Sequence, residues 1–177
     1  MFRAITIAAV ALVLAGCAVW WKLARRPAKK GSVPAGRFPR LERLVAAAVW
    51  ISFIVLAFTG FLGATIPGRS LAGFWTLTHV TFSALFAGSL AILLVMRAEA
   101  CSFADTCQAG RFSLAQKICF WTIAACGILL ILSIVTAMFP VLGTDGQYIS
   151  TEVHRYSALV ALLAAIVYAC LALKRKV

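Results

Sequence analysis

The stretch that decides the fold class is residues 152–177, which read EVHRYSALVALLAAIVYACLALKRKV. Between Tyr156 and Lys174 it holds no charged residue, so it is long and apolar enough to cross a hydrocarbon layer of about 30 Å as an α-helix. A basic run from Lys174 to Lys176 ends the helix. His154 lies near its start, about one turn inside the membrane. We therefore predict a membrane-spanning helix that carries one histidine.

The rest of the chain has the same apolar character. Of its 177 residues 63% are apolar and only 12% are charged, which is more apolar surface than a soluble domain could bury. The sequence lacks the alternating pattern that a membrane β-barrel needs. We predict an all-α membrane protein with five transmembrane helices, at about residues 4–21, 41–66, 71–96, 117–142 and 152–177. Residues 143–146, Gly-Thr-Asp-Gly, are predicted to form a short loop.

The basic residues are distributed unevenly along the chain. The net charge is +12, but in a membrane protein such charge sets orientation and does not indicate nucleic-acid binding. Lys and Arg number 17, of which residues 22–43 hold eight and the segments 97–117 and 174–176 hold three each. Only Arg3, Arg69 and Arg155 remain on the other side. This distribution predicts a multi-pass membrane protein with its N-terminus outside and its C-terminus in the cytoplasm; the family resemblance described below implies that the membrane is the bacterial inner membrane and that the outer side is the periplasm.

The first apolar run allows more than one interpretation. It could be a signal peptide, or residues 14–17, Leu-Ala-Gly-Cys, could be a lipoprotein cleavage box, but both require export of the chain that follows. Eight cations follow the run and one precedes it, which favours an uncleaved anchor. We predict an N-terminal transmembrane anchor at residues 1–27, a basic cytoplasmic linker at 28–40 and a four-helix membrane domain at 41–177.

His79 and His154 are the chain's two histidines. In the predicted topology they lie about eight residues into the third helix and about two or three into the fifth, and both helices run from outside to inside. They can therefore share a depth in the outer third of the membrane, where facing helices of a bundle can hold a cofactor. Our hypothesis is that they ligate one haem iron. Either histidine could instead be a hydrogen-bonded packing residue between helices.

Two arginines lie near the predicted ligands. Arg69 precedes the third helix and Arg155 follows His154, and arginine suits carboxylates such as haem propionates. We predict that both arginines bind the propionates, although they could also be solvated at the headgroups or neutralised by Glu152 and Asp145. The six cysteines form no Cys-x-x-Cys-His motif, which excludes covalent c-type haem attachment.

Three stretches carry a resemblance to a known family. Residues 40–45, Arg-Leu-Glu-Arg-Leu-Val, lead to Phe-Thr-Gly at 58–60; residues 110–117, Gly-Arg-Phe-Ser-Leu-Ala-Gln-Lys, are followed by Phe-Trp at 120–121; and the His154 helix ends near Val-Tyr at 167–168. These stretches resemble the cytochrome b (gamma) subunit of bacterial formate dehydrogenases and its relatives in thiosulfate reductase and hydrogenase complexes. The resemblance covers roughly residues 37–173, so the first helix is extra.

The family holds two b haems stacked across the membrane. His79 and His154 match the ligands of its outer haem. The ligand positions of its inner haem hold Ala46 and a residue of the stretch 166–168, Ile-Val-Tyr, and none of these ligates iron in the bis-histidine manner. The resemblance therefore implies one haem b instead of two.

The resemblance also implies a function. The protein would be a monohaem b-type cytochrome subunit that transfers electrons between the quinone pool and a periplasmic redox partner. It would anchor a complex in the membrane and would not be a catalyst by itself. An iron–sulfur subunit and a periplasmic catalytic subunit are the implied partners, and quinone would meet the haem in the outer half of the membrane. The alternative is a haem-free anchor or assembly subunit. A transporter is disfavoured, because no predicted helix carries a charged residue at mid-depth.

Overall fold

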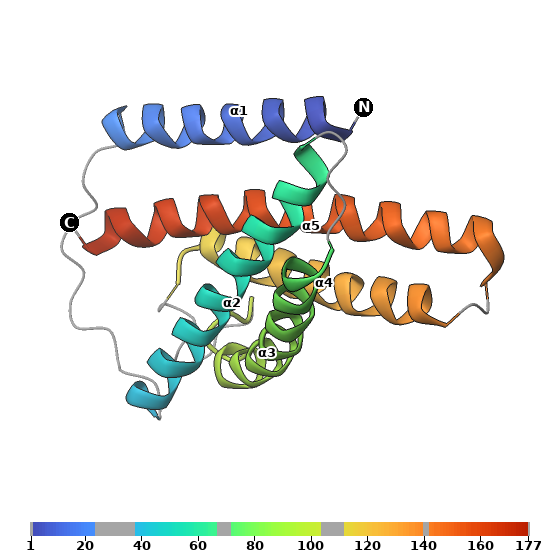
Figure 1. The fold of residues 1–177 in the computed structure, drawn as a ribbon. Helices are drawn as coiled ribbons and strands as arrows, with labels where there is room; N and C mark the ends of the chain where they lie inside the picture. The colour runs from blue at the N-terminus through green and yellow to red at the C-terminus, as the bar shows by residue number, and fades with distance from the viewer. Residues whose placement is uncertain (1, 24–37, 67–71, 104–111, 140–141, 177) are drawn as a thin grey trace. The chain divides into compact units, whose positions relative to one another are not determined.

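The computed structural model of the chain describes residues 2–23, 38–66, 72–103, 112–139 and 142–176. Within these residues the structure is α-helical and contains no strand (Figure 1). The helices are α1 (Phe2–Leu23), α2 (Pro39–Thr65), α3 (Phe74–Arg97), α4 (Leu114–Met138) and α5 (Gly143–Lys176). All five are long and apolar enough to cross a membrane, which confirms the predicted fold class of five transmembrane helices.

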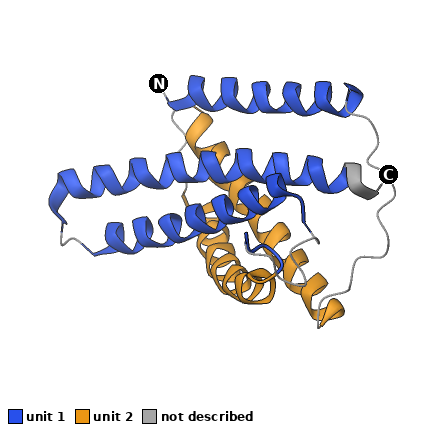
Figure 2. Ribbon diagram, turned by 180° about the vertical axis from the view of Figure 1, so that it is seen from behind, with its two compact units in different colours: residues 1–33, 100–177 blue, residues 34–99 orange. Residues whose placement is uncertain are grey.

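The helices form two compact units (Figure 2). The first unit, residues 1–33 and 100–177, contains α1, α4 and α5, and the second unit, residues 34–99, contains α2 and α3. Each unit contains one pair of helices that are consecutive in the chain, and each is described by itself below. The predicted linker at residues 28–40 lies mostly outside the described residues, so the predicted domain division stays a prediction.

In the second unit α2 and α3 form an antiparallel hairpin. The order of the contacts shows this, because Glu42 near the start of α2 pairs with Arg97 at the end of α3, whereas Thr59 pairs with His79 near the start of α3. Apolar side chains at helical spacing form the interface. The buried members are Val45, Val49, Phe86, Leu90 and Leu93. Phe86 is therefore a packing residue of this hairpin.

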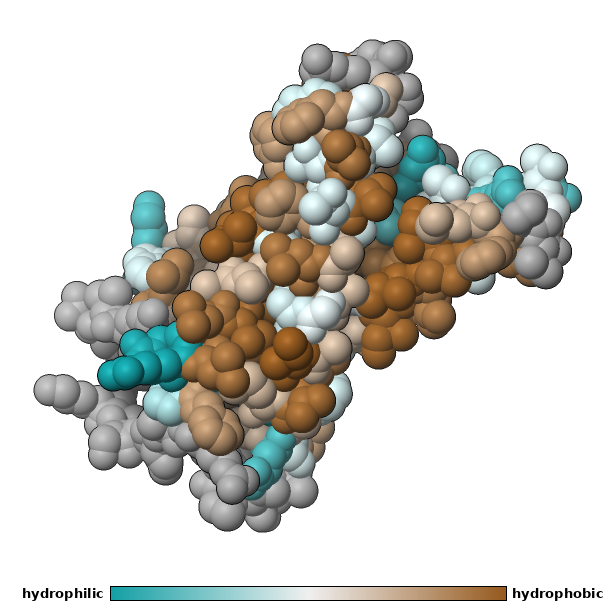
Figure 3. All heavy atoms as spheres, turned by 60° about the horizontal axis from the view of Figure 1, so that its bottom comes forward, coloured by the Kyte–Doolittle hydropathy of each residue, from teal (hydrophilic) through white to brown (hydrophobic). Residues whose placement is uncertain are grey.

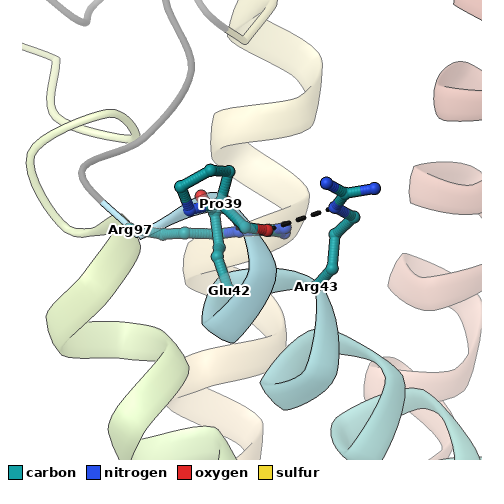
Figure 4. Close-up of polar contacts among 4 residues, drawn as sticks. All are labelled: Pro39, Glu42, Arg43 and Arg97. Atoms are coloured by element: carbon teal, nitrogen blue, oxygen red, sulfur yellow. Dashed lines mark hydrogen bonds and ion pairs between the residues drawn. The ribbon is translucent and has the colours of Figure 1, made fainter.

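An ion pair joins α2 and α3 at the end that is predicted to be cytoplasmic (Figure 4). Arg97 donates from Nε to Glu42 Oε1 over 2.8 Å, and the two side chains are only 15% and 5% exposed. Arg43, one residue further on, is exposed and donates to the carbonyl oxygen of Pro39 over 3.2 Å. Since a buried carboxylate is costly without a partner, Arg97 stabilises the charge of Glu42 inside this interface.

In the first unit α4 and α5 form a second antiparallel hairpin. Ser133 contacts His154, and Thr136, three residues later on α4, contacts Ser150, four residues earlier on α5. The interface is lined by small residues, including Ala161 and Ala165, which are 1% and 4% exposed. Small residues let two helix backbones approach closely within a membrane.

Two predicted boundaries of this hairpin are wrong. The predicted loop at residues 143–146 is the first turn of α5, which begins at Gly143 instead of Glu152. Gly143 makes the turn with φ at +64°, and Asp145 lies in the first helical turn, where a negative charge favours helix formation. Similarly, α4 begins at Leu114 instead of Lys117, because Ser113 and Gln116 form a capping box.

Helix α1 packs along α5 in the same direction. The rings of Phe2 and Tyr156 meet edge to face at 5.4 Å, and the Sγ atom of Cys170 lies 4.0 Å from the carbonyl oxygen of Cys17. The contacts therefore advance together along both helices. In a chain whose spans alternate in direction, the first and fifth spans point the same way, because three spans lie between them. The parallel packing of α1 and α5 agrees with this alternation.

The described helices expose many large apolar side chains. Among them are Leu12, Ile54, Val95 and Leu132, at 75%, 61%, 83% and 53% exposure. Figure 3 shows apolar side chains covering much of the surface on the face it presents. Exposure of this kind along helices is unfavourable in water and expected in lipid.

Candidate functional site

His79 lies five residues after Phe74, the first residue of α3, and is half-buried against α2. Its Nδ1 atom is 2.7 Å from the hydroxyl oxygen of Thr59, a side chain that is 2% exposed. Gly60 lies beside the same ring, because a Cβ atom at this position would come 3.3 Å from Cε1 of His79. The absence of a side chain at residue 60 therefore makes room for the imidazole.

His154 has a closely similar environment on α5. Its Nδ1 atom is 3.1 Å from the hydroxyl oxygen of Ser133 on α4, and Ser133 is 5% exposed. One turn away, Thr136 and Ser150 share a hydroxyl–hydroxyl hydrogen bond of 3.0 Å. Each histidine of the chain is thus held at Nδ1 by a buried hydroxyl on the other helix of its hairpin.

Each of these hydroxyls also lies within hydrogen-bonding distance of a carbonyl group of its own helix. Thr59 Oγ1 lies 2.8 Å from the carbonyl oxygen of Val55, and Ser133 Oγ lies 2.9 Å from that of Leu130. Each hydroxyl has one hydrogen, for which the carbonyl oxygen and an unprotonated Nδ1 compete, and its oxygen can accept from a protonated Nδ1.

The two histidine–hydroxyl pairs lie at the same distance from their hairpin ends. Thr59 is six residues before the end of α2 and Ser133 is five residues before the end of α4, or about 9 Å and 8 Å along the axis. The prediction that His154 lies two or three residues into its helix is wrong, since it is eleven residues after Gly143. The difference arises because α5 extends beyond the end of α4.

Of the two predicted propionate partners, the structure describes Arg155. Arg155 on α5 is about half exposed, and its Nη1 donates to Glu152 Oε1 on the same helix over 2.7 Å. This is the neutralisation by Glu152 that the sequence left open. Arg69 lies outside the described residues.

The stretch that carries the most specific part of the family resemblance has a structural role at the other end of α4. Gln116 closes the capping box with Ser113, the buried Lys117 donates from Nζ to the carbonyl oxygen of Ser102, and Trp121 donates from Nε1 to that of Cys101 over 3.0 Å. These contacts hold the segment after α3 against the start of α4. The Ser-x-x-Gln pattern before an apolar run was the sequence signal for the cap.

A haem and a bare metal ion differ in the ligands that they require from the protein. No group of three or more His, Cys, Asp or Glu side chains that could hold a metal comes together in the part of the chain that the structure describes. A haem requires only axial ligands from the protein, and imidazole nitrogens are suitable.

Comparisons of the chain with protein-family models, with curated proteins and with solved structures give no match.

Proposed function

We propose that the protein is a monohaem b-type cytochrome subunit that transfers electrons between the quinone pool and a periplasmic redox partner. The observation that carries the proposal is the repeated arrangement of the two histidines. In each hairpin a buried hydroxyl binds Nδ1 of the histidine, and the pair lies about 8 to 9 Å from the hairpin end. His79 and His154 are the proposed axial ligands.

The proposed ligand set suits electron transfer. A haem held by two imidazoles supplies one-electron chemistry and leaves no open axial position for binding oxygen. The residues of this chain orient the two rings, exclude water and anchor the site in the membrane. Arg69 and Arg155 are the proposed partners of the propionates; for Arg155 this means that its guanidinium binds a propionate in addition to Glu152 or in its place.

The proposed partners follow from the position of the site. A haem in the outer half of the membrane can exchange electrons with a periplasmic iron–sulfur subunit of a larger oxidoreductase complex, and with a quinone in the same half of the bilayer. The catalytic subunit of that complex would be a separate periplasmic chain, and this protein would serve as its electron-transfer and membrane-anchoring subunit.

The topology can be tested with reporter fusions in bacterial cells. We propose an inner-membrane protein with a periplasmic N-terminus, because most of its basic residues lie in segments on one side. A green fluorescent protein fused after Val177 should fluoresce, and alkaline phosphatase inserted after Arg69 should be active. Phosphatase activity from a fusion at Val177 would contradict this orientation.

Haem content tests the functional proposal directly. The pyridine haemochrome spectrum of the purified protein should give one haem b per polypeptide, and the reduced-minus-oxidised spectrum should show a b-type α band. Two haems per chain would contradict the monohaem proposal, and none would support the alternative below.

The alternative function is a haem-free anchor or assembly subunit. The two histidine–hydroxyl contacts favour it as well, because they are interhelical hydrogen bonds that can serve packing alone. In this case the protein would contain no haem, and a variant with alanine at both histidines would still assemble with its complex.

A further inference from the structure

We propose that Cys17 and Cys170 are a pair of thiols that an apolar hydroperoxide joins as a disulfide, which links α1 covalently to α5. The pair lies within the unit of α1, α4 and α5 and involves neither histidine. The Sγ atom of Cys170 lies 4.0 Å from the carbonyl oxygen of Cys17. Cys17 is also the last residue of the stretch Leu-Ala-Gly-Cys at 14–17, which the proposed function does not use.

Helical spacing places both cysteines on the contacting faces of α1 and α5. Phe2 and Tyr156 mark these faces, because their rings meet at 5.4 Å. Cys17 follows Phe2 by 15 residues and Cys170 follows Tyr156 by 14 residues, and each interval is about four turns of a helix. Both cysteines are half-buried, whereas Leu14 on another side of α1 is 52% exposed. Each cysteine therefore faces the neighbouring helix.

The two cysteines also share a level along the axes of their helices. Cys17 is six residues before Leu23, the last residue of α1, and Cys170 is six residues before Lys176, the last residue of α5. Both therefore lie about 9 Å from the ends of their helices. Because α1 and α5 run in the same direction, this agreement brings the two side chains to one level of the interface.

The geometry of the pair is compatible with an S–S bond after a side-chain rotation. The carbonyl oxygen of Cys17, which the Sγ atom of Cys170 contacts, is four bonds from the Sγ atom of Cys17. A disulfide requires an S–S distance of about 2.05 Å and Cα atoms about 4.4–6.8 Å apart. A different rotamer of Cys17 and a slight approach of the two helices would satisfy both requirements.

The oxidation balances with a hydroperoxide as the oxidant. One sulfur attacks the peroxide and becomes a sulfenic acid, the O–O bond breaks, and the released alkoxide takes the thiol proton and leaves as an alcohol. The second sulfur then attacks the sulfenic sulfur, so that the S–S bond forms and water leaves with the second proton. Each sulfur loses one electron and the peroxide gains two. Both sulfurs lie in apolar segments that an uncharged oxidant enters more readily than a charged reductant.

Tryptic peptides identify this disulfide in the full-length protein. Trypsin cleaves after lysine and arginine, so that Cys17 lies in peptide 4–22 and Cys170 in peptide 156–174, each with one cysteine. Membranes that contain the protein are treated with cumene hydroperoxide, blocked with N-ethylmaleimide, digested without reductant and analysed by mass spectrometry. The wild-type protein should give peptide 4–22 linked to peptide 156–174, and dithiothreitol should separate the two.

Variants test whether the pair is specific. Cys17→Ser and Cys170→Ser should each abolish the linked peptide, whereas Cys119→Ser on α4 should not. In a matched variant, Cys17→Ala is combined with Ala18→Cys, which turns the thiol by about 100° around α1 and away from α5. This variant has the same number of cysteines and the same cleavage sites, and it should give no linked peptide.

Each result of this experiment either supports or contradicts the disulfide. A linked peptide that requires both cysteines and the native position of Cys17 supports it. The proposal is wrong if the oxidised wild-type protein yields the two peptides only in unlinked form. Equal linkage in the variant with the shifted thiol would also overturn it, because collisions would then be unspecific. So would a lipid on Cys17, as expected of a lipoprotein box, since its sulfur would be blocked.

Discussion

Replacing His79 or His154 with alanine should remove the haem from the purified protein. Each variant lacks one of the two proposed axial imidazoles, and the chain has no third histidine that could take its place. We expect bound haem per polypeptide to fall at least about tenfold, since even partners of metal ligands affect affinity by this factor. The measurement is the pyridine haemochrome content together with the reduced-minus-oxidised α band.

Thr136→Val is the control for the His154 variant. Thr136 lies next to the Ser133–His154 contact in the α4–α5 hairpin, and its loss removes an interhelical hydrogen bond without removing a ligand. This variant should keep its haem. A His154→Ala protein with an unchanged α band would be incompatible with the proposed ligation, whatever the stability of the protein.

Breaking the Glu42–Arg97 pair should strongly destabilise the chain. In Arg97→Gln the buried carboxylate of Glu42 loses the charge of Arg97, and removing one member of a buried pair costs about 3–5 kcal/mol. In Glu42→Gln the guanidinium of Arg97 likewise loses the charge of Glu42. The free energy of unfolding in mixed detergent micelles measures both effects.

The neighbouring Arg43 provides a matched control. It is exposed and donates to a carbonyl group, so Arg43→Gln should change the free energy of unfolding by no more than about 1 kcal/mol. The double variant Glu42→Gln with Arg97→Gln should be less destabilised than the sum of the single variants, because no unpaired charge is buried. Additive effects would show that the two groups do not stabilise each other.

The number of membrane spans could be predicted from the sequence because it depends on local composition. A span requires about 20 consecutive apolar residues, and the segments around Thr6, Val49, Phe86, Ala124 and Ala161 satisfy this condition without reference to one another. The parity of the spans then determines which helix ends share a membrane face. For this reason the same side of the membrane was predicted for the two histidines before any contact between helices was known.

Helix boundaries were less predictable where polar residues begin a helix. Residues 143–146 have the composition of a loop, but Gly143 followed by Thr144 and Asp145 is also a helix N-terminus. Likewise, the capping box of Ser113 and Gln116 extends α4 backward from Lys117. The position of His154 relative to the start of its helix was therefore predicted incorrectly. Its position next to Ser133 is given by the hydrogen bond between the two side chains.

Apolar length thus specifies five helices, since burial in lipid acts on every segment independently. The partners of particular polar groups depend on the rotation and the axial register of one helix against the next. A shift of one residue turns a side chain by about 100° and would separate Thr59 from His79, Ser133 from His154 and Glu42 from Arg97. Many packed side chains set that register together, so these three pairs were decided by the tertiary structure.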